Sequence, residues 1–316
     1  MSLSQDIKRK TAELGFDLSG VTDAAPIDAE QAKAFARWLE AGFAGDMGYM
    51  GRNLQKRLSP ATLLEGAQSV IVVGLNYTPP KLLEGHTSAT PTGKVANYAL
   101  YEDYHGFVKR RLRDLVASLE SLIDVEFKFK ICVDSAPLAE RALAARAGLG
   151  FVGRNHMLIN PELGCQIFLG EIVTSLKLEP DEPIAADCSD CRKCMDACPT
   201  GALRGDGQFD ARRCVNYLTI EHKGPIGPEL AAKIADRLFG CDECVLVCPY
   251  QKDAPACTNE QFKFHDDRGN LDLKEILNMD AEMFGATFGD SPIKRVGLEG
   301  LKRNARICLA NEERRC

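Results

Sequence analysis

The stretch Cys188-Ser-Asp-Cys191-Arg-Lys-Cys194-Met-Asp-Ala-Cys198-Pro199 decides the architecture of the second half of the chain. Its spacing is C-x2-C-x2-C-x3-C-P, the run with which bacterial ferredoxins bind 4Fe–4S clusters, and the fourth cysteine of that run binds the other cluster of a pair. A partial repeat follows at Cys241-Asp-Glu-Cys244-Val-Leu-Val-Cys248-Pro249, with Cys214 upstream. Together the two runs supply enough thiolates for two cubane clusters.

If the last cysteine of each run crosses to the other cluster, the ligands divide into two sets of four. The expected sets are Cys188, Cys191, Cys194 and Cys248 for cluster 1, and Cys198, Cys214, Cys241 and Cys244 for cluster 2. Structural zinc is the alternative, because sites of four cysteines also bind zinc. The tight spacing and the proline that ends each run favour the clusters, so we expect a protein that handles single electrons.

The composition outside the cysteine runs is that of an ordinary globular protein. The chain has 316 residues, of which 45% are hydrophobic and 27% are charged, and this length predicts about two domains. The N-terminus has no apolar leader and no apolar run has membrane-spanning length, so we expect a cytoplasmic protein whose thiols bind metal. The net charge of −6 argues against a wholly basic surface for nucleic acid but allows a local basic patch.

Hydrophobic periodicity predicts a mixed fold for residues 1–180, either α/β or α+β. Helices are expected at 4–15, 29–41, 104–123 and 136–147, strands at 69–75, 125–133 and 166–178, and a Pro- and Gly-rich loop at 79–93. An acidic, proline-containing linker at 179–183 leads into a cluster domain at 181–256. Residues 257–316 are expected to be helical, ending in a helix at 298–313. No G-x-G-x-x-G follows the strand at 69–75, so a nicotinamide site is not indicated.

Several segments resemble the epoxyqueuosine reductase family. Besides the ferredoxin run, they are Val133-Asp-Ser-Ala-Pro-Leu-Ala-Glu-Arg141, Ala147-Gly-Leu-Gly-Phe-Val-Gly-Arg-Asn155, Phe168-Leu-Gly-Glu-Ile172, Tyr217-Leu-Thr-Ile-Glu-His-Lys-Gly224 and Arg237-Leu-Phe-Gly-Cys-Asp-Glu-Cys-Val-Leu-Val-Cys-Pro-Tyr250. The resemblance implies a cobalamin-dependent oxidoreductase with two 4Fe–4S clusters, which reduces epoxyqueuosine to queuosine at the wobble position of tRNA. The implied fold is a nitroreductase-like, cobalamin-binding N-terminal domain, then a bacterial-ferredoxin-like two-cluster domain and a short helical remnant of a HEAT-like extension.

The resemblance also implies that electrons pass through the clusters to cobalamin and that Asp134 is the proton donor. Asp134 follows an expected strand, so we place it at the rim of the sheet where ligands bind, with a pKa raised by burial beside the corrin. The alternative is that Asp134 caps the helix at 136–147. His105 is a second candidate, for positioning the substrate or tuning protonation, unless it is simply a satisfied histidine on a helix face.

Contacts to the corrin are expected by resemblance and from positions beside glycine, proline or loops. They are Arg57, Asn97, Asp134, Asn155, His156, Leu158, Gln166 and Asn216. His156 is expected near the corrin but not as a cobalt ligand, and ordinary packing is the alternative for each residue. Glu140 and Arg141 are expected to form an ion pair on a helix surface, which contributes little to stability.

The implied partner is the anticodon stem-loop of tRNA. Candidate phosphate contacts are Lys109-Arg110-Arg111-Leu112-Arg113, Arg212-Arg213, Lys223, Lys302-Arg303 and Arg306, unless each is a solvated helix face. We also expect a monomer and an external electron donor such as a flavodoxin or ferredoxin. Two other functions stay open: a cobalamin and iron–sulfur reductase that acts on a small molecule, and a non-catalytic electron-transfer protein.

Overall fold

A computed structural model describes residues 3–80 and 90–314. The expected loop at 79–93 lies largely outside these ranges, at 81–89, and its last residues instead begin strand β3 (Thr92–Val95). No helix within the described ranges has the length and apolar character needed to cross a membrane.

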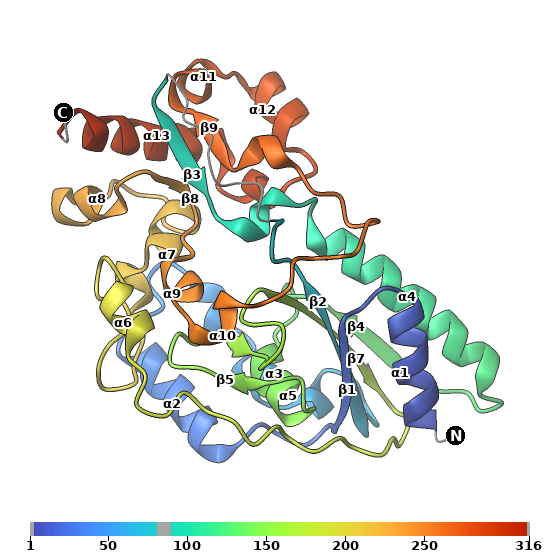
Figure 1. Ribbon diagram of the computed structural model, residues 1–316. Coiled ribbons are helices and arrows are strands. Elements are labelled where there is room, and N and C mark those ends of the chain that lie inside the picture. The colour runs from blue at the N-terminus through green and yellow to red at the C-terminus, as the bar shows by residue number, and fades with distance from the viewer. Residues whose placement is uncertain (1–2, 81–89, 315–316) are drawn as a thin grey trace.

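A four-stranded antiparallel sheet, with strand order β1-β2-β7-β4, organises the first half of the chain (Figure 1). The strands are β1 (Leu18–Asp23), β2 (Ser69–Asn76), β7 (Ile167–Thr174) and β4 (Phe129–Cys132). Both central strands are buried along their whole length, which confirms the expected buried strand at 69–75. Antiparallel pairing belongs to the α+β alternative. Asp134 was expected at a ligand-binding edge because ligands bind at the ends of the strands in parallel sheets. That reason is wrong here, since the sheet is antiparallel.

Side chains along β2 alternate between two packed layers. Ile71 and Val73 belong to the core that includes α1 (Leu3–Glu13) and α4 (Tyr104–Leu122), whereas Val70 and Val72 belong to the core beneath α5 (Glu140–Arg146). Figure 1 shows α1 and α4 on one side of the sheet and α5 on the other. The sheet is thus covered on both faces.

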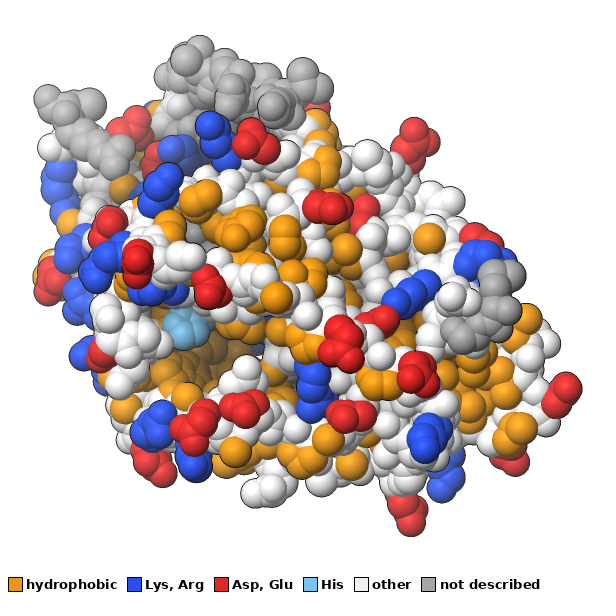
Figure 2. Space-filling view, turned by 60° about the horizontal axis from the view of Figure 1, so that its bottom comes forward, with side chains coloured by type: hydrophobic (Ala, Val, Ile, Leu, Met, Phe, Trp, Pro, Cys, Tyr) orange, Lys and Arg blue, Asp and Glu red, His pale blue; other side chains and the backbone are white. Residues whose placement is uncertain are grey.

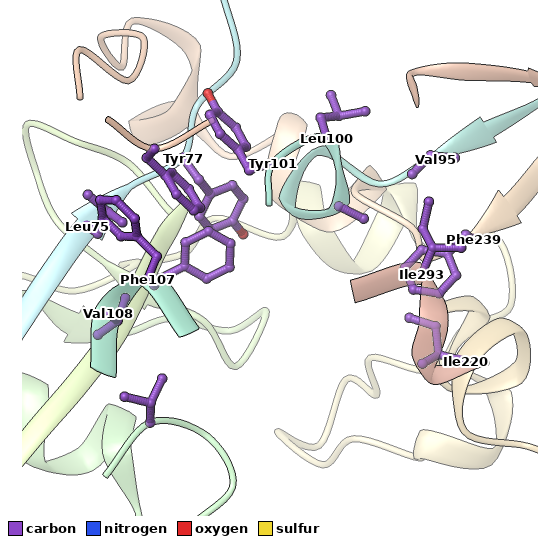
Figure 3. Packing of buried hydrophobic residues seen from close by; sticks show 14 of the residues in the cluster. Leu75, Tyr77, Val95, Leu100, Tyr101, Phe107, Val108, Ile220, Phe239 and Ile293 are labelled. Atoms are coloured by element: carbon purple, nitrogen blue, oxygen red, sulfur yellow. The ribbon is translucent and has the colours of Figure 1, made fainter. Parts of the chain in front are cut away.

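A second sheet joins distant parts of the chain. Its order is β8-β3-β9, with β8 at Arg237–Phe239 parallel to β3 and β9 at Asn270–Asp272 antiparallel to it. The helix expected at 298–313 is α13 (Gly297–Glu313), which packs on β8 and on α11 (Leu273–Asn278). Figure 3 shows the resulting core, in which Val95, Phe239 and Ile293 come from all three expected segments of the chain.

The remaining elements are short and lie mainly around the cysteine runs and the C-terminal segment. The helices are α2 (Ala29–Glu40), α3 (Leu54–Leu58), α6 (Lys193–Ala197), α7 (Val215–Ile220), α8 (Pro228–Ile234), α9 (Glu243–Leu246), α10 (Pro249–Lys252) and α12 (Ala281–Phe288). A two-stranded ribbon pairs β5 (Phe151–Val152) with β6 (Leu158–Ile159). Single 3-10 turns are η1 (Gly48–Met50), η2 (Pro60–Thr62), η4 (Asn97–Leu100), η5 (Ala211–Arg213), η6 (Asp266–Arg268) and η7 (Pro292–Arg295).

Two expectations about local structure are wrong. The strand at 125–133 is only β4, since residues 125–128 leave the sheet and Val125 is exposed. The helix at 136–147 begins only at Glu140, after Pro137, so Asp134 is too far away to cap it and Ala139 occupies the cap position without a side-chain bond. The expected linker at 179–183 has no helix or strand, and the Asp181 carboxylate within it accepts from the Val21 amide at 2.9 Å.

Candidate active site

The four thiols expected around cluster 1 line one cavity of about 40 Å³. They are Cys188, Cys191, Cys194 and Cys248, and α6 and α9 pack together beside them. Among the described residues, no three His, Cys, Asp or Glu side chains are grouped closely enough to hold a single metal ion. The first ligand set surrounds a space instead.

The second set is also gathered, around Cys244. Burial, then the neighbouring Cys214 and Cys241 thiols and, more weakly, Cys198, raise the pKa of Cys244 above its usual range. Mutual repulsion of this kind between thiolates disappears when a cationic iron–sulfur core takes their charge. The tertiary structure therefore brings each expected set of four thiols together.

Backbone amides point at ligand sulfurs. The Arg154 amide lies 3.5 Å from Cys188 Sγ, and the Ala202 amide lies 3.3 Å from Cys198 Sγ. Such N–H donors stabilise the negative charge of a cluster and adjust its reduction potential. The donor set and these amides fit two iron–sulfur clusters.

A second group of polar side chains surrounds Asp134, in the loop after β4. The backbone of Asp134 is left-handed, with a φ of 51°, a conformation that aspartate tolerates better than most residues. Its carboxylate Oδ2 lies 3.2 Å from Nε2 of His105, and its side chain is 56% exposed. Asp134 thus presents a carboxylate to solvent rather than to the helix that follows it.

His105 sits between two carboxylates. Asp103 caps the N-terminus of α4 by accepting from the His105 amide, and the same oxygen lies 2.7 Å from His105 Nδ1. The other Asp103 oxygen pairs with Lys294 Nζ at 2.7 Å. The helix cap therefore fixes the imidazole in the orientation in which its other nitrogen reaches Asp134.

The charges of this group place the proton on His105. Burial opposes the shift, but Asp103 and then Asp134 raise the pKa of His105 to about 9. The hydrogen bond from His105 in turn lowers the pKa of Asp134. The expected raised pKa of Asp134 is therefore wrong for the protein without its ligands, because a cation faces the carboxylate.

Sequence patterns missed several side chains of this site. Lys294 and Arg295 come from η7, and Arg295, which pairs with Glu221, also lowers the pKa of Asp134. Lys109, which the sequence did indicate as a phosphate contact, lies one turn along α4 from His105 and donates to Ser135 Oγ at 3.3 Å. The position of Asp103 before α4 is typical of a helix cap. No local sequence pattern predicts that Lys294 and Arg295 of η7 lie near Asp134.

The residues expected to contact the corrin are not alike in their surroundings. Arg57 Nε and Gln166 Nε2 are buried and have no hydrogen-bond partner within the described chain. Asn97 and His156 are half-buried and Asn216 is exposed. Asn155 is buried and its amide donates to the Cys244 carbonyl, and Leu158 is part of the hydrophobic core. Asn155 and Leu158 are thus occupied within the protein. The residues that can contact a ligand are Arg57, Gln166, Asn97, His156 and Asn216.

The face drawn in Figure 2 is hollowed, and hydrophobic side chains gather around the hollow beside a histidine. Unpartnered donors such as those of Arg57 and Gln166 suit a ligand that carries acceptor groups on its edge. Pockets for large cofactors combine such an apolar lining with a few polar side chains.

Several of the expected phosphate contacts already have partners within the protein. Arg303 donates to the carbonyls of Leu218, His222 and Gly224 and is therefore part of the packing between α13 and the end of α7. Arg212 is paired with Asp210, and Arg110 is paired with Glu102. Arg110, Arg113 and Arg111, which donates to Gln261, line a cavity of about 380 Å³, and Arg306 is exposed. The expected role of Arg303 in nucleic-acid contact thus gives way to a structural one.

Two family models match the chain. One is described as "Epoxyqueuosine reductase QueG, DUF1730" and matches residues 57–135, and the other is described as "4Fe-4S double cluster binding domain" and matches residues 187–251. The second match covers all eight cysteines of the two ligand sets.

Epoxyqueuosine reductases of several bacteria are similar over almost the whole chain. That of Pseudomonas aeruginosa is 39% identical over 312 residues, which are 98% of this chain and 85% of its own length. That of Leadbetterella byssophila is 40% identical over 304 residues, which are 95% of this chain and 96% of its own length. The second relative has no long segment outside the matched part.

Solved structures with the same fold are also epoxyqueuosine reductases. The Streptococcus thermophilus protein has a TM-score of 0.90 and 33% identity, over 99% of this chain and 82% of its own. The Bacillus subtilis protein, with its catalytic aspartate loop swung out of the active site, has a TM-score of 0.90 and 31% identity, over 98% and 81%. A complex with an epoxyqueuosine-modified tRNA stem loop has a TM-score of 0.88 and 31% identity, over 98% and 81%.

Proposed function

Because this chain belongs to the epoxyqueuosine reductase family, whose members are oxidoreductases, we propose that it reduces epoxyqueuosine to queuosine at the wobble position of tRNA, with Asp134 as the proton donor. The observation that supports the proposal is the 3.2 Å contact between Asp134 Oδ2 and His105 Nε2, in the same molecule as a cavity lined by four thiols. A match to the double-cluster domain model accounts for those thiols.

We propose that the two sets of four thiols hold two 4Fe–4S clusters and that cobalamin lies near Asp134. When bound, these groups supply the two electrons that the reduction requires. Arg57 and Gln166 are suited to hold the edge of the corrin, because their buried nitrogens lack partners within the described chain. Asn97, His156 and Asn216 border the site, while Asn155 and Leu158 support it from within.

Conversion of the epoxide into an alkene consumes two electrons and two protons and releases water. The departing oxygen is strongly basic, and a positioned acid typically accelerates such a step by about 10²–10⁴-fold. The Asp134 side chain is exposed to solvent, and Nε2 of His105 lies 3.2 Å from its carboxylate. We propose that the proton held by His105 passes to the Asp134 carboxylate, which delivers it to the departing oxygen, and that solvent supplies the second proton that forms water.

The proposed partner is the anticodon stem-loop, in line with the relative that is bound to such a stem loop. Single-stranded loops allow a modified base to turn out of its stack at a cost of a few kcal/mol. We propose that the loop at 133–139 moves to admit the base, as the catalytic aspartate loop of the Bacillus subtilis relative is displaced. A flavodoxin or ferredoxin is the proposed electron donor to a cytoplasmic monomer.

The test is anaerobic reconstitution with iron, sulfide and cobalamin, followed by an assay on an epoxyqueuosine-containing stem-loop. The wild-type protein should form queuosine, and Asp134→Asn should bind the stem-loop equally well but turn over about 10²–10⁴-fold more slowly. Turnover of Asp134→Asn near the wild-type rate would exclude the proton-donor role. Reduction of the free nucleoside as fast as the stem-loop would favour the small-molecule alternative, and a failure to take up corrinoid would favour the electron carrier.

A further inference from the structure

Glu171 is a carboxylic acid in the middle of the central sheet. It lies on β7 between Ile172 and Gly170, is fully buried, and neither of its carboxyl oxygens accepts a hydrogen bond from a donor among the described residues. An ionised carboxylate without partners is among the most expensive groups to bury. The groups that face Glu171 therefore determine whether its carboxyl group carries a proton.

The side chain of Glu171 lies on the face of the sheet that packs against α5. Alternate residues of β7, such as Leu169 and Val173, belong to the core beneath α5, and Glu171 shares their face. Across the sheet Glu171 pairs with Cys132 of β4, whose thiol belongs to the same core. The first residue of α5 is Glu140, α5 packs against β7, and burial and then the Glu140 carboxyl raise the pKa of Glu171.

Two facing carboxyl groups cannot both be ionised in a buried place, and neither can donate to the other unless one carries a proton. Burial and then Glu140 raise the pKa of Glu171 well above its usual range, whereas burial and then Asp134 raise the pKa of Glu140 to about 7. The cations nearest this pair are Arg57, which is half-buried, and Arg141, which donates to the His156 carbonyl. The expected surface ion pair between Glu140 and Arg141 is thus replaced by an inward-facing Glu140.

Glu140 also contacts the loop that carries Asp134. Its Oε1 accepts a hydrogen bond from the backbone amide of Asp134 at 2.5 Å. Asp134 is the residue with the left-handed backbone, a conformation that costs a non-glycine residue about 1 kcal/mol and persists only where the surroundings hold it. The bond from Glu140 stabilises that conformation directly.

We propose that Glu140 and Glu171 form a carboxyl pair that shares one proton, in which Glu171 donates to Glu140 and Glu140 holds the amide of Asp134, so that Glu140 is a positioning residue for the proton donor. The catalytic meaning of the pair rests on the proposed function, but its structure does not. Glu171 keeps the proton and orients Glu140, and Glu140 fixes the loop. No proton leaves the pair in the reaction.

The test measures the loop rather than turnover, on the full chain. Glu140→Ala should speed hydrogen exchange of the peptide containing Asp134 about tenfold, because one hydrogen bond of the amide is lost. Glu140→Gln keeps an acceptor oxygen and should restore exchange to within about twofold of the wild type. Unchanged exchange in Glu140→Ala would overturn the proposal.

A second measurement examines the shared proton. The infrared carbonyl band of a protonated carboxyl should be present in the wild-type protein at pH 7, persist in Glu140→Gln, and disappear in Glu171→Gln. Absence of the band from the wild type would overturn the shared proton. Asp134→Asn separates this inference from the proposed function, because it should slow turnover about 10²–10⁴-fold yet leave both exchange and the band unchanged. If turnover of Asp134→Asn stays near the wild-type rate while Glu140→Ala still loosens the loop, only the proposed function fails.

Discussion

The Nε2 atom of His105 lies 3.2 Å from Oδ2 of Asp134, and this contact connects the first turn of α4 to the loop after β4. Asp103 holds the opposite ring nitrogen, so the imidazole is clamped between two carboxylates. The proton rests on the histidine, and the aspartate presents its carboxylate to solvent. The contact therefore places a protonated imidazole directly behind an exposed carboxylate.

The first prediction concerns the pH dependence of stability. The raised pKa of His105 contributes stability that is fully present below about 6.5 and is lost as the pH rises through about 9. Because the side chain is 31% exposed, we expect a loss on the order of 2 kcal/mol across that window. Thermal unfolding of the wild type and of His105→Gln should converge above pH 9, and a constant difference up to pH 10 would contradict the assignment.

The second prediction concerns the cluster ligands. Reconstituted wild-type protein should hold about eight iron atoms per chain, and Cys248→Ala should hold about four. Cys165→Ala is the matched control, since Cys165 is buried beside Cys248 but belongs to neither ligand set. Iron and acid-labile sulfide analysis gives the result. About two zinc atoms without sulfide in the wild type would show that the sites are structural zinc.

The third prediction separates structure from nucleic-acid binding on α13. Arg303→Ala should lower the free energy of unfolding by about 3 kcal/mol, because a charged donor to three backbone carbonyls is removed. Arg306→Ala, at an exposed position of the same helix, should leave stability within about 0.5 kcal/mol of the wild type. Denaturant titration measures both, and equal stability of the two variants would contradict the structural role of Arg303.

The fourth prediction concerns the substrate. Lys109 reaches the residue after Asp134, so Lys109→Ala should weaken stem-loop binding and reduce the slope of log affinity against log salt by about one. Arg9→Ala is the control, because Arg9 pairs with Asp6 and Glu13 on α1. Binding measured at several salt concentrations tests this, and an unchanged slope for Lys109→Ala would exclude a phosphate contact.

The spacing of residues along the sequence was enough to predict features that lie within one loop or one helix. The cysteine runs predicted a double-cluster domain, because short spacings leave a chain few ways to surround a cluster, and the match to the double-cluster model over residues 187–251 confirms that domain. The division of the thiols into two sets of four ligands stays a prediction. The long amphipathic helices α4 and α13 were predicted within one residue at each end, since their periodicity reports one buried face.

Residue patterns along the chain were enough to identify the family and the double-cluster domain, whereas the role of Asp134 stays a prediction. Tertiary structure alone decided where the proton sits, because the pKa of Asp134 depends on His105 and Arg295, which lie far from it along the chain. It also decided that Arg303 binds backbone and that Glu140 faces inward to a buried Glu171. Electrostatic and hydrogen-bond partners act through space, and no pattern in neighbouring residues records which distant group will arrive beside a charge.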